Sequence, residues 1–427
     1  MFSMLTLSFS FRGVLKDQCK NKTVWNSFLA LRNYNVKFED VRNLKDRVHP
    51  EYQININSKL QTLKWLKQKP MKNIFIVKKP NTPETTEDMT YLICKLLSQI
   101  YYKYENFNII VQEKCKLDIK NSLNQCGYFD ETFVLYSGSD EEIVNKADLM
   151  ITLGGDGTIL HAVAMFNKKK VPPVLPISLG TLGFLLPYQM SEFDKAFQDI
   201  MNNKSKVIYR TRLACYLDGK ILKSDVKENL NGESGYNKVF AMNDIFIYRG
   251  NSPHLLKMDI FIDGEKLTTA IADGVILSTP TGSTAYSLSS GGSIVSPRVP
   301  CIMLTPICPR SLSFRPLILP YSSHIKIKIV DTKRVSKLED SPAKLSIDSV
   351  VQCNLNHNDE IHVINEVGTI YTSDNQDIPF KDMLLVNNEH ISKNQHHGIH
   401  CIAKDENDWT HGINELLGFN SSFKSIR

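Results

Sequence analysis

The sequence predicts two domains, an α/β domain built on a parallel sheet and a following domain that is mainly β. Strand-like segments alternate with helix-like segments between residues 73 and 179, and this alternation is typical of a parallel sheet flanked by helices. A glycine-rich turn at 154–157 joins one of these strands to an apolar helix. After about residue 206 short alternating strands are separated by turn residues, which indicates a domain of antiparallel strands.

The first domain is expected over residues 60–206 and begins with a short buried strand at 73–77. Thr82 and Pro83 mark the start of a helix, because apolar residues recur at helical spacing from Met89 to Ile100. Further strands are expected at 107–111, 132–136, 147–153 and 171–179. These elements predict a Rossmann-like α/β arrangement that carries the glycine-rich turn.

The second domain is expected over residues 207–373 as a β-rich, sandwich-like domain. Turn residues at Asp218-Gly219 and Asp263-Gly264 separate its strands, and the polar stretch 223–237 is expected to be a surface loop. A tail over 374–427 contains a helix that ends at Gly418. The strands are expected at 208–217, 239–248, 257–262 and 325–330, and the helix at 407–417.

Composition excludes several classes of protein. The chain has 427 residues, of which 42% are hydrophobic and 22% charged, and no apolar run is long enough to cross a bilayer. The net charge of +6 is concentrated in residues 1–70, which carry 13 Lys and Arg against 5 Asp and Glu, and the rest has a net charge of −2. A nucleic-acid-binding protein needs a basic face on its folded body, so neither nucleic acid nor a membrane is an expected partner.

Cysteine and histidine patterns predict no metal site and no disulfide framework. The nine cysteines are dispersed without a Cys-x-x-Cys pair, and the histidines form no constellation. A reducing compartment therefore fits best.

The N-terminal segment, residues 1–45, resembles a mitochondrial transit peptide. Its first 38 residues contain six basic residues and one acidic residue, and they begin with an apolar, Ser-rich run. A secretory signal places its positive charge before the apolar run, whereas here Arg12 follows it. Mitochondrial import is the favoured interpretation, and a disordered basic tail is the alternative.

The string Leu153-Gly-Gly-Asp-Gly-Thr-Ile-Leu-His161 carries the clearest chemistry. Glycines between a strand and a helix let backbone N–H groups approach a phosphate, and the helix N-terminus adds partial positive charge. Asp156 stands where other phosphate loops have a lysine, so it would either hold a metal or accept a proton from an attacking hydroxyl. The alternative is that Asp156 only caps the helix.

Two further strings carry polar groups next to strands. The string at 279–287, Thr-Pro-Thr-Gly-Ser-Thr-Ala-Tyr-Ser, crowds hydroxyls into one turn, and Thr281, Ser283, Thr284 and Ser287 can bond sugar or base edges. Its alternative is a hydroxyl-stabilised turn with a helix cap. The pair Asn243-Asp244 enters a strand, and by itself this pair is more typical of a turn.

These three strings, in this order, resemble the NAD kinase family. The GGDGT loop alone is shared with diacylglycerol and sphingosine kinases, and the string at 279–287 separates NAD kinases from them. The similarity continues through 305–316, 361–371 and 407–423, so that it covers about residues 55–427. The later pieces are most similar to the fungal mitochondrial NADH kinases within this family.

The resemblance implies an enzyme that uses ATP and Mg²⁺ to phosphorylate the adenosine ribose 2′-hydroxyl of NADH and NAD⁺, giving NADPH and NADP⁺ in the mitochondrial matrix. It also implies homo-oligomers and a preference for NADH. Asp156 becomes the catalytic base, and it also contacts the dinucleotide together with Gly157. The implied phosphate loop is Gly154, Gly155, Gly157 and Thr158; the implied dinucleotide contacts are Asn243, Asp244, Asp273, Thr284, Ala285, Tyr286 and Ser289.

Three positions depart from the family pattern. Asp244 replaces the more common glutamate and is one methylene shorter, and Tyr248 stands where many members have an acidic residue. Ile347-Asp348-Ser349 replaces Phe-Asp-Gly at a turn. Two other hypotheses remain at this stage: a lipid kinase that shares the GGDGT loop, and a dinucleotide sensor without turnover, for which Asp156 would not be needed.

Overall fold

The computed structural model describes residues 35–54, 58–78, 107–125, 132–167, 169–180, 183–217, 238–330, 343–365, 370–371, 377–378 and 398–418. The chain divides into two compact units, Met1–His49 with Lys67–Leu153 and Pro50–Leu66 with Gly154–Arg427. The helix predicted from Thr82, the loop predicted at 223–237 and the turn at Asp218-Gly219 lie outside the described residues, as do residues 1–34.

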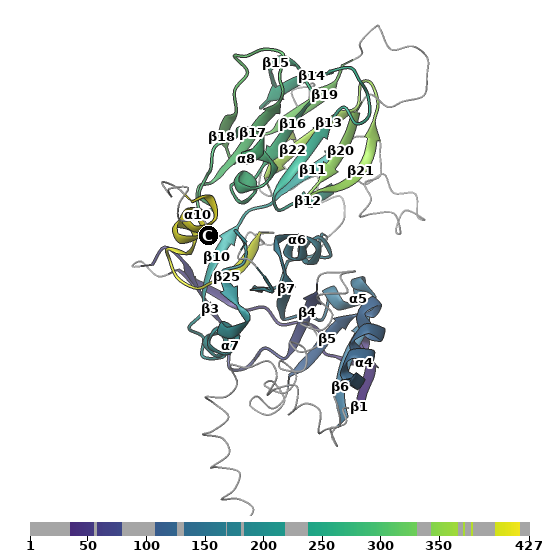
Figure 1. Ribbon diagram of the computed structural model, residues 1–427, viewed down its shortest axis with the longest axis vertical. Coiled ribbons are helices and arrows are strands. Elements are labelled where there is room, and N and C mark those ends of the chain that lie inside the picture. The colour runs from purple at the N-terminus through teal and green to yellow at the C-terminus, as the bar shows by residue number, and fades with distance from the viewer. Residues whose placement is uncertain are drawn as a thin grey trace, which may run out of the picture. The chain divides into compact units, whose positions relative to one another are not determined.

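The first unit contains a parallel sheet, as the sequence predicts (Figure 1). Four neighbouring pairs, β1 with β6, β6 with β5, β5 with β4 and β4 with β7, all run parallel. Every residue of β4 and β7 is buried, because parallel strands are covered on both faces. The elements are β1 (Asn35–Asp40), η1 (Val41–Asn43), β4 (Asn73–Lys78), β5 (Asn108–Gln112), η2 (Glu113–Cys115), α4 (Lys116–Gln125), β6 (Thr132–Gly138), α5 (Asp140–Val144) and β7 (Leu149–Gly154).

A buried carboxylate fixes the N-terminal segment to this sheet. Asp148 is 2% exposed and accepts the backbone N–H groups of Val48 at 2.6 Å and of Lys72 and Asn73 at 2.8 Å each. The strand β1 pairs with β6 over its whole length. The boundary predicted at residue 45 is therefore too late, because the chain is already part of the folded unit from Asn35.

The second unit begins with a mixed sheet in the order β8-β25-β10-β3-β2, with β9 paired to β8. The strand β25 runs parallel to β8, and the remaining pairs along this order are antiparallel. Segments from both ends of the chain therefore meet on β10. The elements are β2 (Glu51–Ile54), β3 (Gln61–Lys64), α6 (Asp156–Ala164), β8 (Val174–Ser178), β9 (Tyr188–Gln189), η3 (Met190–Glu192), α7 (Phe193–Met201), β10 (Lys206–Arg210), β25 (Ile399–Ala403) and α10 (Asp408–Leu417).

Two six-stranded antiparallel sheets form the rest of this unit, together with a small pair of strands, β23 (Ile370–Tyr371) and β24 (Asp377–Ile378). The first sheet is β12 (Lys238–Ala241), β11 (Leu213–Leu217), β22 (Glu360–Asn365), β19 (Ile325–Ile329), β14 (Leu256–Ile262) and β15 (Glu265–Ala272). The second sheet is β18 (Leu317–Pro320), β17 (Cys301–Ile307), β16 (Gly274–Ser278), β13 (Asp244–Tyr248), β20 (Ala343–Ile347) and β21 (Val350–Leu355). A short turn of helix, η6 (Thr281–Thr284) with α8 (Tyr286–Ser289), follows β16.

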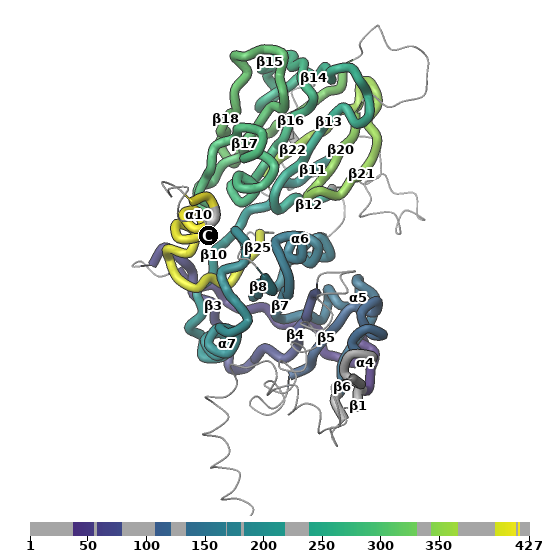
Figure 2. The backbone as a smooth tube through the Cα atoms, in the orientation of Figure 1, coloured from purple at the N-terminus to yellow at the C-terminus, as the bar shows by residue number. Residues whose placement is uncertain are grey.

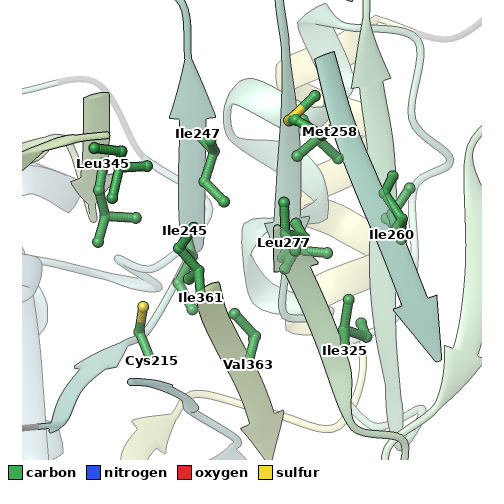
Figure 3. Packing of buried hydrophobic residues seen from close by; sticks show 14 of the residues in the cluster. Cys215, Ile245, Ile247, Met258, Ile260, Leu277, Ile325, Leu345, Ile361 and Val363 are labelled. Atoms are coloured by element: carbon green, nitrogen blue, oxygen red, sulfur yellow. The ribbon is translucent and has the colours of Figure 1, made fainter. Parts of the chain in front are cut away.

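The two sheets share one apolar core, which confirms the predicted sandwich. Alternate residues of each strand point inward, so that Ile245 and Ile247 of β13 meet Ile361 and Val363 of β22 in the same cluster (Figure 3). The alternation leaves the residues between them, such as Phe246, on the outer face of the second sheet. This outer face carries much of the candidate site.

The segment predicted as one strand at 208–217 is two strands. Residues 211–212 separate β10, which belongs to the mixed sheet, from β11, which belongs to the sandwich (Figure 2). The Arg212 side chain between them is 1% exposed, and its guanidinium lies 4.5 Å from the centre of the Phe240 ring. No glycine or proline stands at residues 211–212 to mark this break in the sequence.

Two local predictions are confirmed at turns. Asn407 is the N-cap of α10, and Gly418 ends it in the left-handed conformation at φ 58°. Asp263 and Gly264, with φ of 51° and 87°, form the two-residue connection from β14 to β15, where both positions need positive φ. Within the described part of the chain, the helices are too short or too polar to cross a membrane.

Candidate functional site

The glycine-rich turn places Asp156 at the first position of α6. Gly154 ends β7 with φ 154°, and Gly155 is the N-cap, where no side chain caps the helix. The Asp156 carboxylate instead accepts the backbone N–H of Leu185 at 3.2 Å through Oδ1. The alternative that Asp156 serves only to cap its helix is therefore excluded.

The surroundings of Asp156 make its carboxylate a stronger base than a free aspartate. Burial raises the pKa of Asp156 above its usual value, and the N–H of Leu185 and the charge of Arg210 partly oppose this rise. Gly155 and Gly157 are exposed on either side of it, with open space where a Cβ would stand. The first N–H groups of a helix have no partner within it, so an anion can approach here. Thr158 is buried and donates its N–H to the Gly155 carbonyl at 2.9 Å.

The sequence interpretation missed two contributors to the surroundings of Asp156. The loop at 183–185 supplies the Leu185 N–H, and Arg210 on β10 is 8% exposed and donates to Thr281 Oγ1 at 3.2 Å. The string Leu179-Gly180-Thr181-Leu182-Gly183 contains two glycines after a buried strand, which is a signal of close backbone approach. No sequence pattern marks Arg210, because its importance arises from the pairing of β10.

We expect Gly183→Ala to lower turnover by about 10²-fold, since a misplaced catalytic group costs about that much. A Cβ at Gly183 would stand 2.2 Å from Asp156 Oδ1 and would displace the carboxylate. Gly180→Ala is the matched control, because a Cβ there meets nothing within 4 Å. Equal steady-state kcat for the two variants would contradict the prediction.

The hydroxyl-rich turn at 279–287 divides into a buried set and an exposed set. Thr279 Oγ1 donates to the Met242 carbonyl at 2.6 Å and accepts the Gly282 N–H at 3.0 Å. Ser283 exchanges hydrogen bonds with the backbone of Val295, and Ser287 Oγ bonds Thr305 Oγ1 at 2.8 Å. The expectation that Thr281, Ser283 and Ser287 offer hydroxyls to a ligand is wrong, because they are buried and hold the turn together.

The more accessible set contains the residues of this turn that the family resemblance implies as dinucleotide contacts. Thr284 and Ala285 are half-buried, whereas Tyr286 and Ser289 are exposed, Tyr286 to 43%. The Tyr286 ring packs edge-on against Phe246, with the ring centres 5.1 Å apart. Thr284 ends η6, Ala285 joins it to α8, and Tyr286 and Ser289 begin and end α8. All four lie beyond the end of β16, at least partly accessible to a ligand.

The Asn243-Asp244 pair lies beside this turn because β13 and β16 pair with Asp244 opposite Ser278. Thr279 donates its N–H to the Asn243 carbonyl at 2.9 Å, and a Cβ at Gly282 would lie 2.1 Å from the same oxygen. Asn243 Oδ1 is a buried acceptor without a hydrogen-bond partner among the described residues. A buried acceptor of this kind needs a donor, and a bound ligand can supply one.

A second carboxylate, from Asp348, holds the start of β13. It accepts the N–H groups of Met242 and Asn243 at 2.7 Å each and of Asp244 at 3.1 Å. Asp348 and Ser349 have φ of 45° and 66°, so they form a tight turn between β20 and β21 with both residues at positive φ. Serine at 349 therefore adopts a conformation that favours glycine.

Asp244 is 7% exposed, and burial together with the nearby charge of Asp348 raises its pKa to about 7. Between the ordinary aspartate pKa and pH 7, Asp244 is therefore protonated in the folded protein and ionised in the unfolded chain. The free energy of unfolding should fall as the pH rises through this window.

We expect the free energy of unfolding of Asp244→Asn, taken relative to that of the wild type, to be about 2 kcal/mol higher at pH 8 than at pH 5. The reason is that the amide needs no proton at either pH. Urea unfolding of both proteins at the two pH values measures this difference. A difference that does not change with pH would mean that Asp244 is already ionised in the folded protein at pH 5.

Asp273 lies at the other end of β16. Its carboxylate pairs with Arg249, with Nε and Oδ1 2.6 Å apart. The structure thus brings Asp156, Asn243, Asp244 and the turn 281–289 to one end of the sandwich sheet. Asp273 lies five residues along β16 from Ser278, the partner of Asp244, which is about 16 Å at roughly 3.3 Å for each strand residue.

A pocket of about 450 Å³ borders the loop 183–187 and Arg210 on the side of β25 and α10. Asn243, Asp244, Tyr286 and Ser289 do not line this pocket. The candidate site is therefore the open surface around Asp156 and the outer face of the second sandwich sheet, and not this pocket.

Comparison with known sequences gives the family. The ATP-NAD kinase N-terminal domain matches residues 49–205, and the ATP-NAD kinase C-terminal domain matches residues 242–372. The chain belongs to the ATP-NAD kinase family. The resemblance that the three strings indicate is thereby confirmed.

Two relatives in the family are mitochondrial NADH kinases. The one from Saccharomyces cerevisiae is 50% identical over 393 residues, which cover 91% of this chain and 90% of the relative. The one from Schizosaccharomyces pombe is 38% identical over 71% of this chain and 72% of the relative. The sequence expectation of a similarity to fungal mitochondrial NADH kinases is therefore confirmed.

Solved structures of the family have the same fold. The crystal structure of yeast NADH kinase complexed with NADH superposes with a TM-score of 0.74 at 46% identity, and covers 92% of this chain and 100% of that chain. An NAD kinase from Archaeoglobus fulgidus, in complex with ATP, has a TM-score of 0.51 at 17% identity over 81% of this chain and 98% of that chain. The second likeness shows the fold alone.

Proposed function

We propose that this protein transfers a phosphoryl group from ATP to the 2′-hydroxyl of the adenosine ribose of NADH, and less readily of NAD⁺, producing NADPH and NADP⁺ in the mitochondrial matrix. Membership of the ATP-NAD kinase family and the similarity to two mitochondrial NADH kinases support this. The observation that carries it is the Asp156 carboxylate, which is held by the Leu185 N–H between two open glycines at a helix N-terminus.

Asp156 is proposed as the general base. The attacking hydroxyl loses its proton to the carboxylate while its oxygen forms the new bond to phosphorus, and ADP leaves on the opposite side. Burial favours this role, because the raised pKa of Asp156 makes it a better proton acceptor. The helix N-terminus and the N–H groups at Gly155 and Gly157 are proposed to stabilise the phosphate oxygens.

Mg²⁺ is proposed to enter with ATP and to neutralise charge on its phosphates. Within the described residues, no group of three or more His, Cys, Asp or Glu side chains could hold a metal ion. Mg²⁺ commonly binds through substrate phosphates with few protein ligands, so such a group is not required for this chemistry. Activity should be lost with EDTA and restored by added Mg²⁺.

The adenosine half is proposed to bind at Asn243, Asp244, Thr284, Ala285, Tyr286 and Ser289. Support comes from the unpartnered Asn243 Oδ1, which would accept from an amino group or a hydroxyl. Tyr286 presents an exposed ring that packs edge-on against Phe246 of the same sheet. Asp273 is proposed to contact the other half of the dinucleotide, and the chain is proposed to form homo-oligomers, which light scattering would measure.

One assay tests the function. Purified protein is incubated with ATP and Mg²⁺ and with NADH, NAD⁺ or diacylglycerol, and NADPH, NADP⁺ and phosphatidic acid are quantified. We expect NADPH to form with the highest kcat/KM, and no phosphatidic acid. A preference for NAD⁺ would contradict the NADH assignment, phosphatidic acid would favour the lipid kinase, and tight dinucleotide binding without any product would favour a sensor.

Import is tested by a deletion that ends before the first strand. Removing residues 1–34 should leave an active enzyme in vitro and abolish mitochondrial accumulation, because the basic, Ser-rich segment precedes β1. Removing residues 1–45 should in addition destabilise the first unit, since β1 then is lost. Mitochondrial accumulation of the shorter deletion would contradict the transit-peptide interpretation.

A further inference from the structure

The pocket of about 450 Å³ beside the loop 183–187 is not used by the reaction proposed above. Its walls are this loop, Arg210 of β10, the strand β25 and the start of α10. Asp156, Gly155 and Gly157 do not line it, so phosphoryl transfer at Asp156 takes place outside it. A cavity of this volume accommodates a small organic molecule. The pocket is therefore a candidate site for a ligand other than the reacting groups.

A buried cation without a carboxylate partner lines this pocket. Arg210 is 8% exposed, and within the described ranges it forms no ion pair. Its Nη1 donates to Thr281 Oγ1 at 3.2 Å, while its buried Nε has no hydrogen-bond partner among these residues. A buried charge is normally paired, because removing it from water is costly. A bound anion can supply the missing partner.

Two further cations of the lining are available to the same ligand. Arg298 and Lys59 are exposed, and neither forms an ion pair in the part of the chain that the structure describes. Acidic residues line the pocket as well, but three of them already accept hydrogen bonds from neighbouring donors: Asp405 from the Asn407 N–H, Asp408 from the Lys404 N–H and Glu406 from the Ser58 hydroxyl. The fourth, Glu415, is exposed on α10.

The start of α10 adds a second anion-binding feature. Residues 408–412 line the pocket, and the N-cap, Asn407, makes no side-chain hydrogen bond to the helix. The first N–H groups of a helix have no partner within it and carry partial positive charge, which favours a phosphate group. Apolar side chains complete the lining, namely Leu185, Leu186, Ile208 and Trp409. The pocket thus combines groups that bind an anion with groups that bind an apolar body.

We propose that this pocket binds a small organic phosphate as an effector, with its phosphate group at Arg210, Arg298 and the N-terminus of α10, and its apolar part against Trp409. A guanidinium and backbone N–H groups are typical ligands of phosphate oxygens. Binding does not depend on the proposed function. Only the effect of the effector on turnover rests on that function.

The loop 183–187 connects the pocket to Asp156. It forms one wall of the pocket, and its Leu185 N–H donates to Asp156 Oδ1 at 3.2 Å. Burial raises the pKa of Asp156, and the N–H groups of Leu185 and Phe184 and the charge of Arg210 partly oppose the rise. A phosphate bound to Arg210 offsets that charge. The acidic limb of the pH profile of kcat should therefore move to higher pH when the pocket is occupied.

Calorimetric titration of the full chain tests the binding. The probes are inorganic phosphate and phenyl phosphate, and phenol is the uncharged control. Phenyl phosphate should bind about tenfold more tightly than inorganic phosphate, because its ring adds apolar contact, and phenol should not bind. Phenyl phosphate should also change the tryptophan fluorescence, and Trp409→Phe should lose that change. Absence of binding by both phosphates would overturn the proposal.

Single variants locate the bound anion. Arg298→Gln should weaken phenyl phosphate binding by about fivefold to tenfold, the usual effect of losing a charged hydrogen bond, and Lys59→Gln by about twofold. Glu415→Gln, the matched control of opposite charge, should not weaken it. All three variants should keep the wild-type kcat when no phosphate probe is present. Equal affinity in the wild type and Arg298→Gln would place the anion elsewhere, such as at Gly155, and would overturn the proposal.

Competition separates the effector from the phosphates of ATP. Saturating ATP with Mg²⁺ should leave the affinity for phenyl phosphate unchanged, and phenyl phosphate should raise the midpoint of the acidic limb in the wild type but much less in Arg298→Gln. Displacement by ATP would assign the pocket to the phosphoryl donor and overturn the proposal, and an unmoved limb would overturn its link to Asp156. If the wild type binds phenyl phosphate but forms no NADPH, the proposed function fails and the phosphate site stands.

Discussion

Asp156→Asn is expected to fold like the wild type and to lose turnover by about 10² to 10⁴-fold, the usual contribution of a general base. The asparagine Oδ1 can still accept the Leu185 N–H that the carboxylate accepts at 3.2 Å, so the loop 183–185 keeps its support. What the amide cannot do is take a proton from the attacking hydroxyl. Single-turnover measurement of NADPH formation at saturating ATP checks the loss.

Thermal unfolding and dinucleotide binding are the controls for this variant. Both should be close to the wild type, because the helix α6 does not depend on Asp156 for its cap. The acidic limb of the wild-type pH profile should have its midpoint above the ordinary aspartate pKa, as burial raises the pKa of Asp156. Near wild-type kcat in Asp156→Asn would remove Asp156 from the catalytic role.

Asp348→Ala is expected to lower the free energy of unfolding by about 3 to 5 kcal/mol. The substitution leaves the N–H groups of Met242, Asn243 and Asp244 without their acceptor, and an unsatisfied buried donor costs about 1 to 3 kcal/mol. Urea unfolding followed by tryptophan fluorescence or circular dichroism measures this.

The matched control for that variant is Asp359→Ala. Asp359 accepts the Asn356 N–H at 2.6 Å in an exposed turn of the same unit, so its loss should cost below about 1 kcal/mol. A small effect of Asp348→Ala, equal to that of the control, would show that water reaches the three N–H groups. A weaker affinity for the dinucleotide should accompany the loss of stability, since these N–H groups belong to the proposed adenosine site.

Most of the fold follows from the sequence because its signals are local. The strands β4, β5, β6 and β7 lie within one or two residues of their predicted bounds, since parallel strands are short apolar runs between breakers. Glycine adopts positive φ at the turn Asp263-Gly264 and at the end of α10, Gly418. Both are predictable because glycine is the residue that most readily takes this conformation. The break at 211–212 was missed, because the burial of Arg212 depends on the ring of Phe240, and that residue is distant in sequence.

The candidate site was predictable only in part. The GGDGT loop and the string at 279–287 are recognisable by residue type, but the sequence does not say which hydroxyls face inward. Ser283 and Ser287 are buried, whereas Tyr286 and Ser289 are exposed. The difference arises because Ser283 bonds Val295 and Ser287 bonds Thr305. Arg210 contributes through strand pairing, for which a single sequence has no signal, and the loop at 183–185 contributes through a long-range hydrogen bond that its two preceding glycines, Gly180 and Gly183, only hint at.

The position of β10 has a consequence for how the protein is made. Its neighbours are β3 on one side and β25 on the other, which pair with it through Gln61–Lys64 and Ile399–Ala403. Contacts between segments so distant in sequence form late, because the intervening chain must first be brought together. A ribosome or a translocation channel delivers the chain from its N-terminus, so Arg210 on β10 stays without one flanking strand until residues 399–403 emerge. The surroundings of Asp156 are therefore completed only after residues 399–403 have been delivered.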